Sequence, residues 1–173
     1  VTAIDRIQSV LKITSQEANG ASVHFIHDDI RSVSYSDCSF DCIIVLETLG
    51  LMDKEDDQKL LEKSFSWLNK NGKIIVDCPD PSSTTSSSWT RKLNQGTLQF
   101  ESSFDKQTSI QTITPKLTQN NNEEIQLYDP YSSEKGNYYG VKRYLYSKDE
   151  LKNILSEIGF IVNNTEHYWG DKF

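Results

Sequence analysis

Hydrophobic positions in the first half of the chain follow two alternating periods. Short apolar runs predict strands, and between them apolar residues recur every three or four positions, which predicts helices. The strands are expected at 1–5, 23–26, 40–46 and 73–79, and the helices at 7–19 and 53–68. Phe40 to Leu46 is apolar on both faces, so we expect this strand to be buried between layers. Strands that alternate with helices pair in parallel through right-handed crossovers, which predicts an α/β fold.

The pattern changes after Asp80. A stretch rich in Ser, Thr and Pro, "DPSSTTSSSW", predicts a flexible loop that ends at an apolar anchor, Trp89. Between Gly96 and Leu117, "TLQFESSF" and "SIQTITPKL" alternate with period two, which is typical of antiparallel strands with one solvated face. Asn120 to Asn122 marks a turn, and further strands are predicted at 125–128 and 141–146.

The C-terminal part begins with a capping signal. Ser147 and Glu150 have the spacing of a capping box, and apolar residues then follow on one helical face until Gly159. A last parallel strand is predicted at 160–162, and one more strand at 168–170. We expect no internal repeat.

Composition and charge narrow the class of partner. A chain of 173 residues with 36% apolar residues can form one compact domain, and its net charge of −7 comes without a Lys/Arg cluster. This argues against nucleic acids and acidic membranes and favours a small molecule or a protein. No apolar run reaches the roughly 18 residues of a membrane span. Three cysteines, an odd number, favour the reducing cytoplasm.

Acidic residues lie where three predicted strands end. Asp5, Asp28 or Asp29, and Glu47 each occupy such a position. In open α/β sheets ligands bind at the carboxyl ends of the strands, where an acid can accept hydrogen bonds from a ribose. Alternatively, Asp5 and Asp28 simply begin turns or cap helices, as Asp often does.

The order of these segments resembles a known family. "VTAID", a helix, "VHFIHDDI", "FDCIIVLETLGLM", a helix and "NKNGKIIVDCP" are similar to the class I S-adenosylmethionine-dependent methyltransferases from their second strand onward. "RYLYSKDELKNILSEIGFIV" and "HYWGDKF" resemble the small-molecule branch of that family. The resemblance implies a Rossmann-like, mostly parallel sheet with helices on both faces and an antiparallel β insertion. Residues 1–80 would bind the cofactor, 81–146 would cover the substrate, and 147–173 would return to the main sheet.

The resemblance also implies a site for S-adenosylmethionine. Asp5 matches the acid that holds the cofactor ribose, with Arg6 beside it and Val10 near the nucleoside. Asp29, together with the backbone of Ile30, matches the position that meets the adenine.

The remaining candidate residues are expected near the methionine part of the cofactor and near the methyl acceptor. Leu46 and Glu47 match the strand end beneath the methionine part of the cofactor. Trp89, Tyr128 and Arg143 are candidates for substrate binding, because aromatic rings can roof a pocket and Arg binds carboxylates well. Alternatively, the aromatic residues form cross-strand pairs and Arg143 is an exposed charge on a strand.

The implied reaction is methyl transfer to a small-molecule acceptor by in-line attack on the sulfonium methyl. Orientation and exclusion of water would then be the main contributions of the protein, so no catalytic residue is predicted. No metal site is predicted, because His24 and His27 point to opposite faces of a strand. One alternative is a noncatalytic α/β module that binds proteins. The other is a nicotinamide-dependent oxidoreductase, because the ribose of that cofactor can also be bound by an acidic residue after the second strand.

One feature of the family is missing. Its first strand is followed by a glycine-rich loop, whereas here Asp5 is followed by Arg6 and Ile7, and no glycine cluster occurs. The printed chain is therefore expected to be truncated, to leave two strand edges unpaired, and to bind cofactor poorly on its own. The sequence does not predict an oligomeric state.

Overall fold

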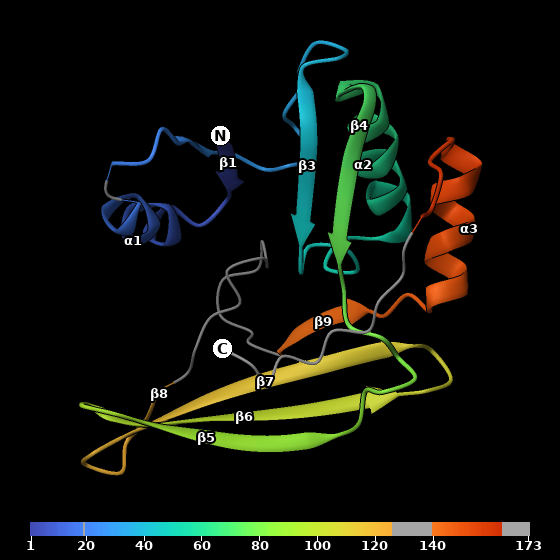
Figure 1. The fold of residues 1–173 in the computed structure, drawn as a ribbon. Coiled ribbons are helices and arrows are strands. Elements are labelled where there is room, and N and C mark those ends of the chain that lie inside the picture. Colours follow the sequence, from blue (N-terminus) through green and yellow to red (C-terminus); the bar gives the residue numbers. More distant parts are fainter. Residues whose placement is uncertain (19, 126–139, 164–173) are drawn as a thin grey trace.

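The structure is a computed structural model that describes residues 1–18, 20–125 and 140–163. An α/β part is followed by an antiparallel sheet and a last helix (Figure 1). The elements are β1 (Thr2–Asp5), α1 (Gln8–Glu17), β2 (His24–His27), β3 (Phe40–Leu46), α2 (Lys54–Trp67), β4 (Leu68–Asp77), β5 (Ser87–Leu93), β6 (Gly96–Asp105), β7 (Ile110–Gln119), β8 (Glu124–Ile125), β9 (Val141–Tyr144) and α3 (Lys148–Ile158).

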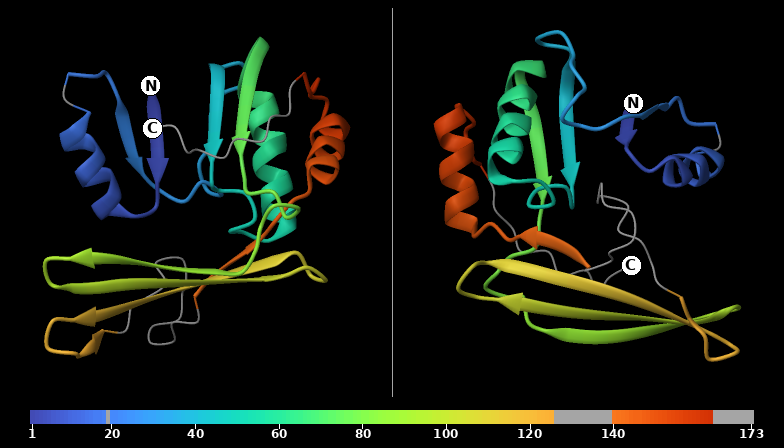
Figure 2. Two further views of the ribbon diagram at one scale, coloured as in Figure 1. Left: turned by 60° about the horizontal axis from the view of Figure 1, so that its bottom comes forward. Right: turned by 180° about the vertical axis from the view of Figure 1, so that it is seen from behind.

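The parallel strands form two separate pairs. β1 pairs with β2, with Ala3 opposite Phe25, and β3 pairs with β4, with Val45 opposite Val76. Among the described residues each of these four strands has a single strand partner. The carboxyl ends of both pairs point toward the antiparallel sheet (Figures 1 and 2).

The main core lies between β3, β4, α2 and α3. α2 begins where the Asp53 side chain accepts a hydrogen bond from the Asp56 backbone N–H at 2.8 Å. Acidic residues in its first turn stabilise the helix, because they interact favourably with the positive end of the helix dipole. α2 and α3 bring apolar side chains against the sheet. The buried cluster consists of Val45, Leu49, Leu60, Leu61, Tyr146 and Leu155.

The expected burial of β3 on both faces is wrong for the described residues. Ile43 and Val45 face the core under α2, but Ile44 and Leu46 on the other face are 59% and 61% exposed. Ile75, which pairs with Ile44, is also exposed. The physical reason is that the described helices α2 and α3 cover only one face of this strand pair.

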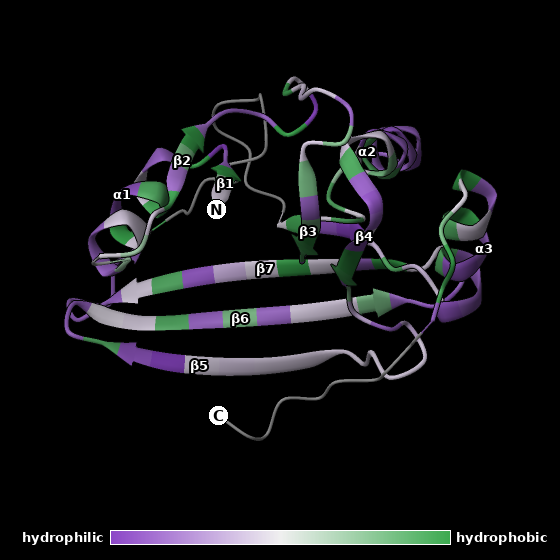
Figure 3. Ribbon diagram, turned by 45° about the horizontal axis from the view of Figure 1, so that its top comes forward, coloured by the Kyte–Doolittle hydropathy of each residue, from purple (hydrophilic) through white to green (hydrophobic). Residues whose placement is uncertain are grey.

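The antiparallel sheet has one apolar and one polar face, as the period-two pattern predicts. Its strand order is β5-β6-β7-β8, and β9 also pairs with β7. Trp89 lies opposite Phe100 and Gln111 opposite Arg143. Apolar and polar residues alternate along β6 and β7 (Figure 3). The sheet extends across the carboxyl ends of β3 and β4 (Figure 1).

Three expected boundaries change. The loop predicted up to Trp89 already contains the start of β5, because residues 87–93 pair with β6 along their whole length. β4 begins directly after α2, and residues 69–72 form an irregularity in the strand rather than a separate helix stop. No strand is present at 160–163 among the described residues.

The capping box is confirmed in part. Ser147 Oγ accepts a hydrogen bond from the Glu150 backbone N–H at 3.2 Å, while the Glu150 carboxylate binds Lys54 and the Tyr144 hydroxyl. α3 ends at Gly159, as expected. Tyr128 and the strand predicted at 168–170 lie outside the described residues. Within the described ranges, no helix is long and apolar enough to cross a membrane.

Candidate functional site

Asp5 lies at the carboxyl end of β1. Its Oδ1 atom accepts a hydrogen bond from the Ile7 backbone N–H at 2.7 Å, so the carboxylate supports the turn into α1. Asx turns of this kind use one carboxylate oxygen. Among the described contacts Oδ2 has no hydrogen bond, and this oxygen can accept one from a ligand.

Asp29 follows β2 and is held by two arginines. The Arg31 side chain donates two hydrogen bonds to it, Nε to Oδ1 at 3.0 Å and Nη2 to Oδ2 at 2.6 Å, and the Arg31 backbone N–H donates a third to Oδ1 at 3.0 Å. Arg6 Nη1 lies 3.7 Å from Oδ2. The bonds from Arg31 lower the pKa of Asp29 to about 2, so the carboxylate is charged at neutral pH. A carboxylate has about four lone-pair positions, which leaves room for a further donor.

The other two residues predicted near the nucleoside differ in accessibility. Val10 on α1 is exposed, whereas Ile30 packs against the buried core cluster. Ile30 can therefore contribute its backbone, as predicted, while its side chain anchors the loop after Asp29. The structure brings Asp5, Arg6 and Asp29 to the same end of the β1–β2 pair.

Glu47 follows the end of β3 and reaches the antiparallel sheet. Its backbone has a φ of +47°, a left-handed conformation that turns the chain sharply away from the strand. Its Oε2 atom accepts a hydrogen bond from Arg143 Nη1 at 3.0 Å. Leu46, just before it, is exposed. A predicted cofactor residue and a predicted substrate residue are thus in direct contact.

Arg143 on β9 is fixed by a short chain of hydrogen bonds. Its Nε atom donates to Gln111 Oε1 at 2.8 Å, and Gln111 Nε2 donates to Ser102 Oγ at 2.8 Å. Gln111 is buried, and only 11% of the Arg143 side chain is exposed. The alternative that Arg143 is a solvated strand charge is therefore wrong.

A buried carboxylate ties the loop after β3 to α2 and to the segment between β9 and α3. Asp57, on α2, is 2% exposed. Its Oδ2 atom accepts hydrogen bonds from the Gly50 N–H and the Tyr146 hydroxyl, both at 2.8 Å, and Oδ1 is buried without a partner. Burial raises the pKa of Asp57 to about 6, although both hydrogen bonds act in the opposite direction. Gly50 O also accepts a hydrogen bond from the Tyr144 N–H at 2.9 Å.

Trp89 lies on β5 and stacks on Phe100 of β6. The ring centroids are 4.1 Å apart with an interplanar angle of 18°, so the predicted cross-strand aromatic pair is present. Trp89 is not a buried anchor, because 53% of it is exposed. Tyr128, the other aromatic candidate, falls in the range that the structure does not describe.

Gln111 and Asp57 are not among the residues predicted from the sequence. Asp57 carried a signal, since it lies three and four positions before Leu60 and Leu61 and therefore on the apolar face of α2. A carboxylate on such a face needs buried partners. Gln111 carried a weaker sequence signal: in "SIQTITPKL" it is the polar residue that falls on the apolar face of β7.

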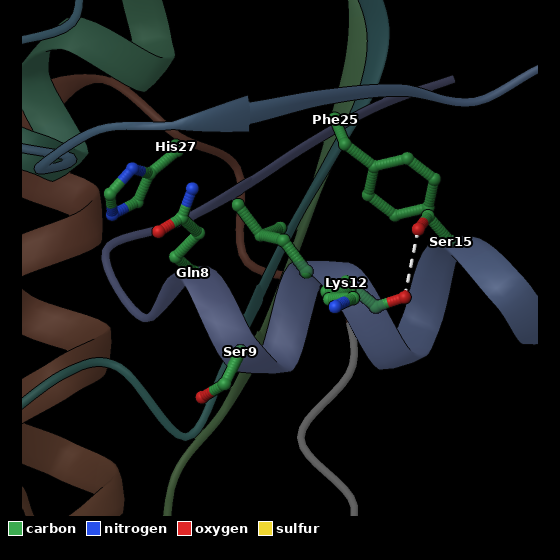
Figure 4. A pocket seen from close by; sticks show the side chains of 7 residues that line it. Gln8, Ser9, Lys12, Ser15, Phe25 and His27 are labelled. Carbon is green, nitrogen blue, oxygen red and sulfur yellow. Dashed lines mark hydrogen bonds between the residues drawn. The ribbon is translucent and has the colours of Figure 1, made fainter.

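A shallow hollow of about 580 Å³ lies between α1 and β2 (Figure 4). It contains none of the predicted site residues. His27 at its edge is fixed by a hydrogen bond from Nε2 to the Arg6 carbonyl at 3.0 Å. The lining residues are Gln8, Ser9, Leu11, Lys12, Ser15, Phe25 and His27.

Known proteins resemble the chain in part of its sequence and in its fold. Residues 1–72 match a family described as methyltransferase domain. No curated protein matches the sequence. An S-adenosylmethionine-dependent methyltransferase from Clostridium acetobutylicum is 14% identical with a TM-score of 0.67, and the match covers 91% of this chain and 62% of that one.

Two further solved structures belong to the same fold. The CcbJ methyltransferase from Streptomyces caelestis is 11% identical with a TM-score of 0.68, and the match covers 92% of this chain and 63% of that one. S-adenosylmethionine-bound CalS10 from Micromonospora echinaspora, an amino pentose methyltransferase, is 9% identical with a TM-score of 0.62, covering 92% and 65%. The chain thus spans less than two thirds of the length of these proteins.

The fold and the family match confirm the predicted resemblance. The chain is a Rossmann-like α/β protein with the fold of the class I S-adenosylmethionine-dependent methyltransferases and an additional antiparallel sheet. Neither a noncatalytic interaction module nor a nicotinamide-dependent oxidoreductase is favoured by these matches.

Proposed function

We propose that the protein is a methyltransferase that uses S-adenosylmethionine as its cofactor and a small molecule as its methyl acceptor. One observation carries this proposal. Asp5 is the last residue of β1, and Asp29 and Glu47 come just after β2 and β3; the carboxyl ends of these strands all point toward the antiparallel sheet. The match of residues 1–72 to a methyltransferase domain supports it.

The acidic residues fit the chemistry of this cofactor. Asp5 keeps Oδ2 available for a ribose hydroxyl, because its described hydrogen bond uses Oδ1. Asp29 is charged and can accept a hydrogen bond from the adenine amino group, with the backbone of Ile30 beside it. Arg6 would hold Asp29 in place, and the exposed Val10 would contact the nucleoside.

The strand end at Leu46 and Glu47 would lie beneath the methionine part of the cofactor. When bound, S-adenosylmethionine supplies an electrophilic methyl group. The antiparallel sheet, which extends over the strand ends, would orient the acceptor and exclude water. Under this proposal residues 1–80 would bind the cofactor, 81–146 would cover the acceptor, and 147–173 would return to the main sheet.

The acceptor side of the site would include Trp89, Tyr128 and Arg143. A small-molecule acceptor is supported by similarity to CalS10, an amino pentose methyltransferase. The excess of acidic residues argues against nucleic acid as a substrate. We place the protein in the cytoplasm on the basis of its three free cysteines.

Isothermal titration of S-adenosylhomocysteine into the intact protein tests the proposal. We expect binding, and we expect Asp5→Ala to weaken it by about 1–3 kcal/mol, because a charged acceptor is lost. Asp37→Ala, which removes an exposed carboxylate from a turn, is the matched control and should leave the affinity unchanged. Absence of binding at millimolar ligand, or binding of a nicotinamide dinucleotide instead, would refute the proposal.

A further inference from the structure

A chain of hydrogen bonds crosses the antiparallel sheet and ends at the carboxyl end of β3. Gln111 on β7 lies directly opposite Arg143 on β9, so both side chains are on one face of the sheet. Gln111 Nε2 donates to Ser102 Oγ on β6, and Arg143 Nε donates to Gln111 Oε1, both at 2.8 Å. Arg143 Nη1 then donates to Glu47 Oε2 at 3.0 Å. β6, β7 and β9 thus together hold a carboxylate that belongs to the parallel part.

The chemistry of these groups fixes the direction of the chain. Arginine has no acceptor, so the amide oxygen of Gln111 must face Arg143, and its nitrogen is left for Ser102. A guanidinium is planar and rigid, so a partner on Nε also fixes the direction in which Nη1 points. Gln111 is buried, and only 11% of the Arg143 side chain is exposed. The guanidinium is therefore a rigid support for Glu47.

The backbone of Glu47 is fixed independently of its side chain. Its N–H donates to the Asp77 carbonyl at the end of β4, at 3.1 Å. The side chain is long, and 66% of it is exposed, so without a partner it would sample several rotamers. Among the described contacts of this carboxylate, the hydrogen bond from Arg143 uses Oε2 and leaves Oε1 for a ligand.

We propose that Arg143 and Gln111 are positioning residues for the cofactor, which hold the Glu47 carboxylate where it accepts the α-ammonium of S-adenosylmethionine. This inference rests on the proposed function and deepens it. The methionine part of the cofactor, beneath which Glu47 would lie, carries a positive amino group, and a carboxylate is its natural acceptor. Arg143 and Gln111 act through Glu47 rather than by touching the cofactor. The sheet that covers the acceptor then also shapes the cofactor site.

The test compares two ligands by isothermal titration into the intact protein. S-adenosylhomocysteine carries the α-ammonium, whereas methylthioadenosine has the same nucleoside without the amino acid part. Glu47→Gln should weaken S-adenosylhomocysteine by about tenfold, because a charge-assisted hydrogen bond is lost. The same variant should leave methylthioadenosine unchanged. Retained binding of methylthioadenosine also reports that a variant is folded.

Arg143→Lys tests the positioning role without changing the charge. A lysine cannot donate to Gln111 and Glu47 from one rigid plane, so the Glu47 side chain must be ordered when the ligand binds. S-adenosylhomocysteine should weaken by about two- to tenfold, the effect of immobilising one side chain, and methylthioadenosine should not. Lys142→Arg is the matched control, because it keeps the charge on the opposite face of β9, and it should leave both affinities unchanged.

Gln111→Met tests the support one step further from the ligand. It removes the acceptor for Arg143 Nε in a side chain of similar shape and should also weaken S-adenosylhomocysteine alone. Gln99→Met, on the opposite face of β6 from Ser102, is its control and should change nothing. In a Glu47→Gln background neither Arg143→Lys nor Gln111→Met should cause a further loss, because no carboxylate is left to position.

Three results would overturn the inference. They are an unchanged affinity for S-adenosylhomocysteine in Arg143→Lys and Gln111→Met, an equal loss for both ligands, or a loss that persists in the Glu47→Gln background. The last two are what a merely structural role of the chain would produce.

Titration of the unmodified protein separates the two proposals. If both ligands bind and the variants do not discriminate between them, the positioning role is wrong and the proposed function stands. If S-adenosylhomocysteine does not bind to the unmodified protein, the proposed function fails, and the positioning role fails with it.

Discussion

Asp57→Asn should change how stability depends on pH. Asp57 is almost fully buried, and its pKa is about 6 in the folded protein against 3.8 in the unfolded chain. The folded state therefore keeps a proton that the unfolded state has lost between these two values. Stability from this group is present below pH 3.8 and is lost as the pH rises toward 6. About two pKa units correspond to roughly 3 kcal/mol.

Urea unfolding followed by tryptophan fluorescence between pH 4 and pH 7.5 measures this effect. Asparagine cannot ionise, so the free energy of unfolding of Asp57→Asn should gain about 3 kcal/mol relative to the unmodified protein across that range. The amide left without a partner at the Oδ1 position costs about 1–3 kcal/mol at every pH and does not alter the trend.

Asp37→Asn is the control for this measurement. It removes an exposed carboxylate from a turn and should follow the unmodified protein across the same pH range. If the curves of Asp57→Asn and the unmodified protein run parallel, burial does not raise the pKa of Asp57 and the reasoning is wrong.

Three further variants test neighbouring contacts. Tyr146→Phe removes a hydrogen bond that lowers the pKa of Asp57, so the pH-dependent loss of stability should extend to higher pH in the same urea experiment. Gly50→Ala should lower the melting temperature, because Gly50 has a φ of +85° and a Cβ there would overlap the Tyr144 carbonyl oxygen; an unchanged melting temperature would contradict this account. Ser147→Ala should cost about 1 kcal/mol through the lost helix cap, and Ser156→Ala, inside the helix, is its control.

Local sequence signals were sufficient to predict much of the fold. α3 was predicted with its start at Ser147 and its end at Gly159, because the cap, the apolar stripe and the terminal glycine agree. β5 was missed because "SSSW" has the composition of a loop. Its strand conformation depends on pairing with β6, where Trp89 meets Phe100, and that contact is not visible in a local pattern.

The candidate site was predictable only strand by strand. The positions of Asp5, Asp29 and Glu47 followed from where apolar runs end. The contact between Glu47 and Arg143 did not, because the two residues are 96 positions apart and meet only when the antiparallel sheet packs against the parallel one. The partner of a surface-accessible carboxylate is decided by tertiary packing rather than by sequence spacing.

The double attachment of Gly50 has a consequence for engineering. The Gly50 N–H is bound by α2 and its carbonyl by β9, so the turn after β3 is a joint between the two sheets. A chimera that replaces residues 81–146 with the corresponding segment of another protein must reproduce the backbone of residues 144–146. Otherwise the turn after β3 loses its attachment and Glu47 is no longer held in position. At the far end of the sheet the turn between β5 and β6 is bound to the loop after β7, because Asn120 donates hydrogen bonds to the carbonyls of Asn94 and Gln95, so these two loops should be exchanged together.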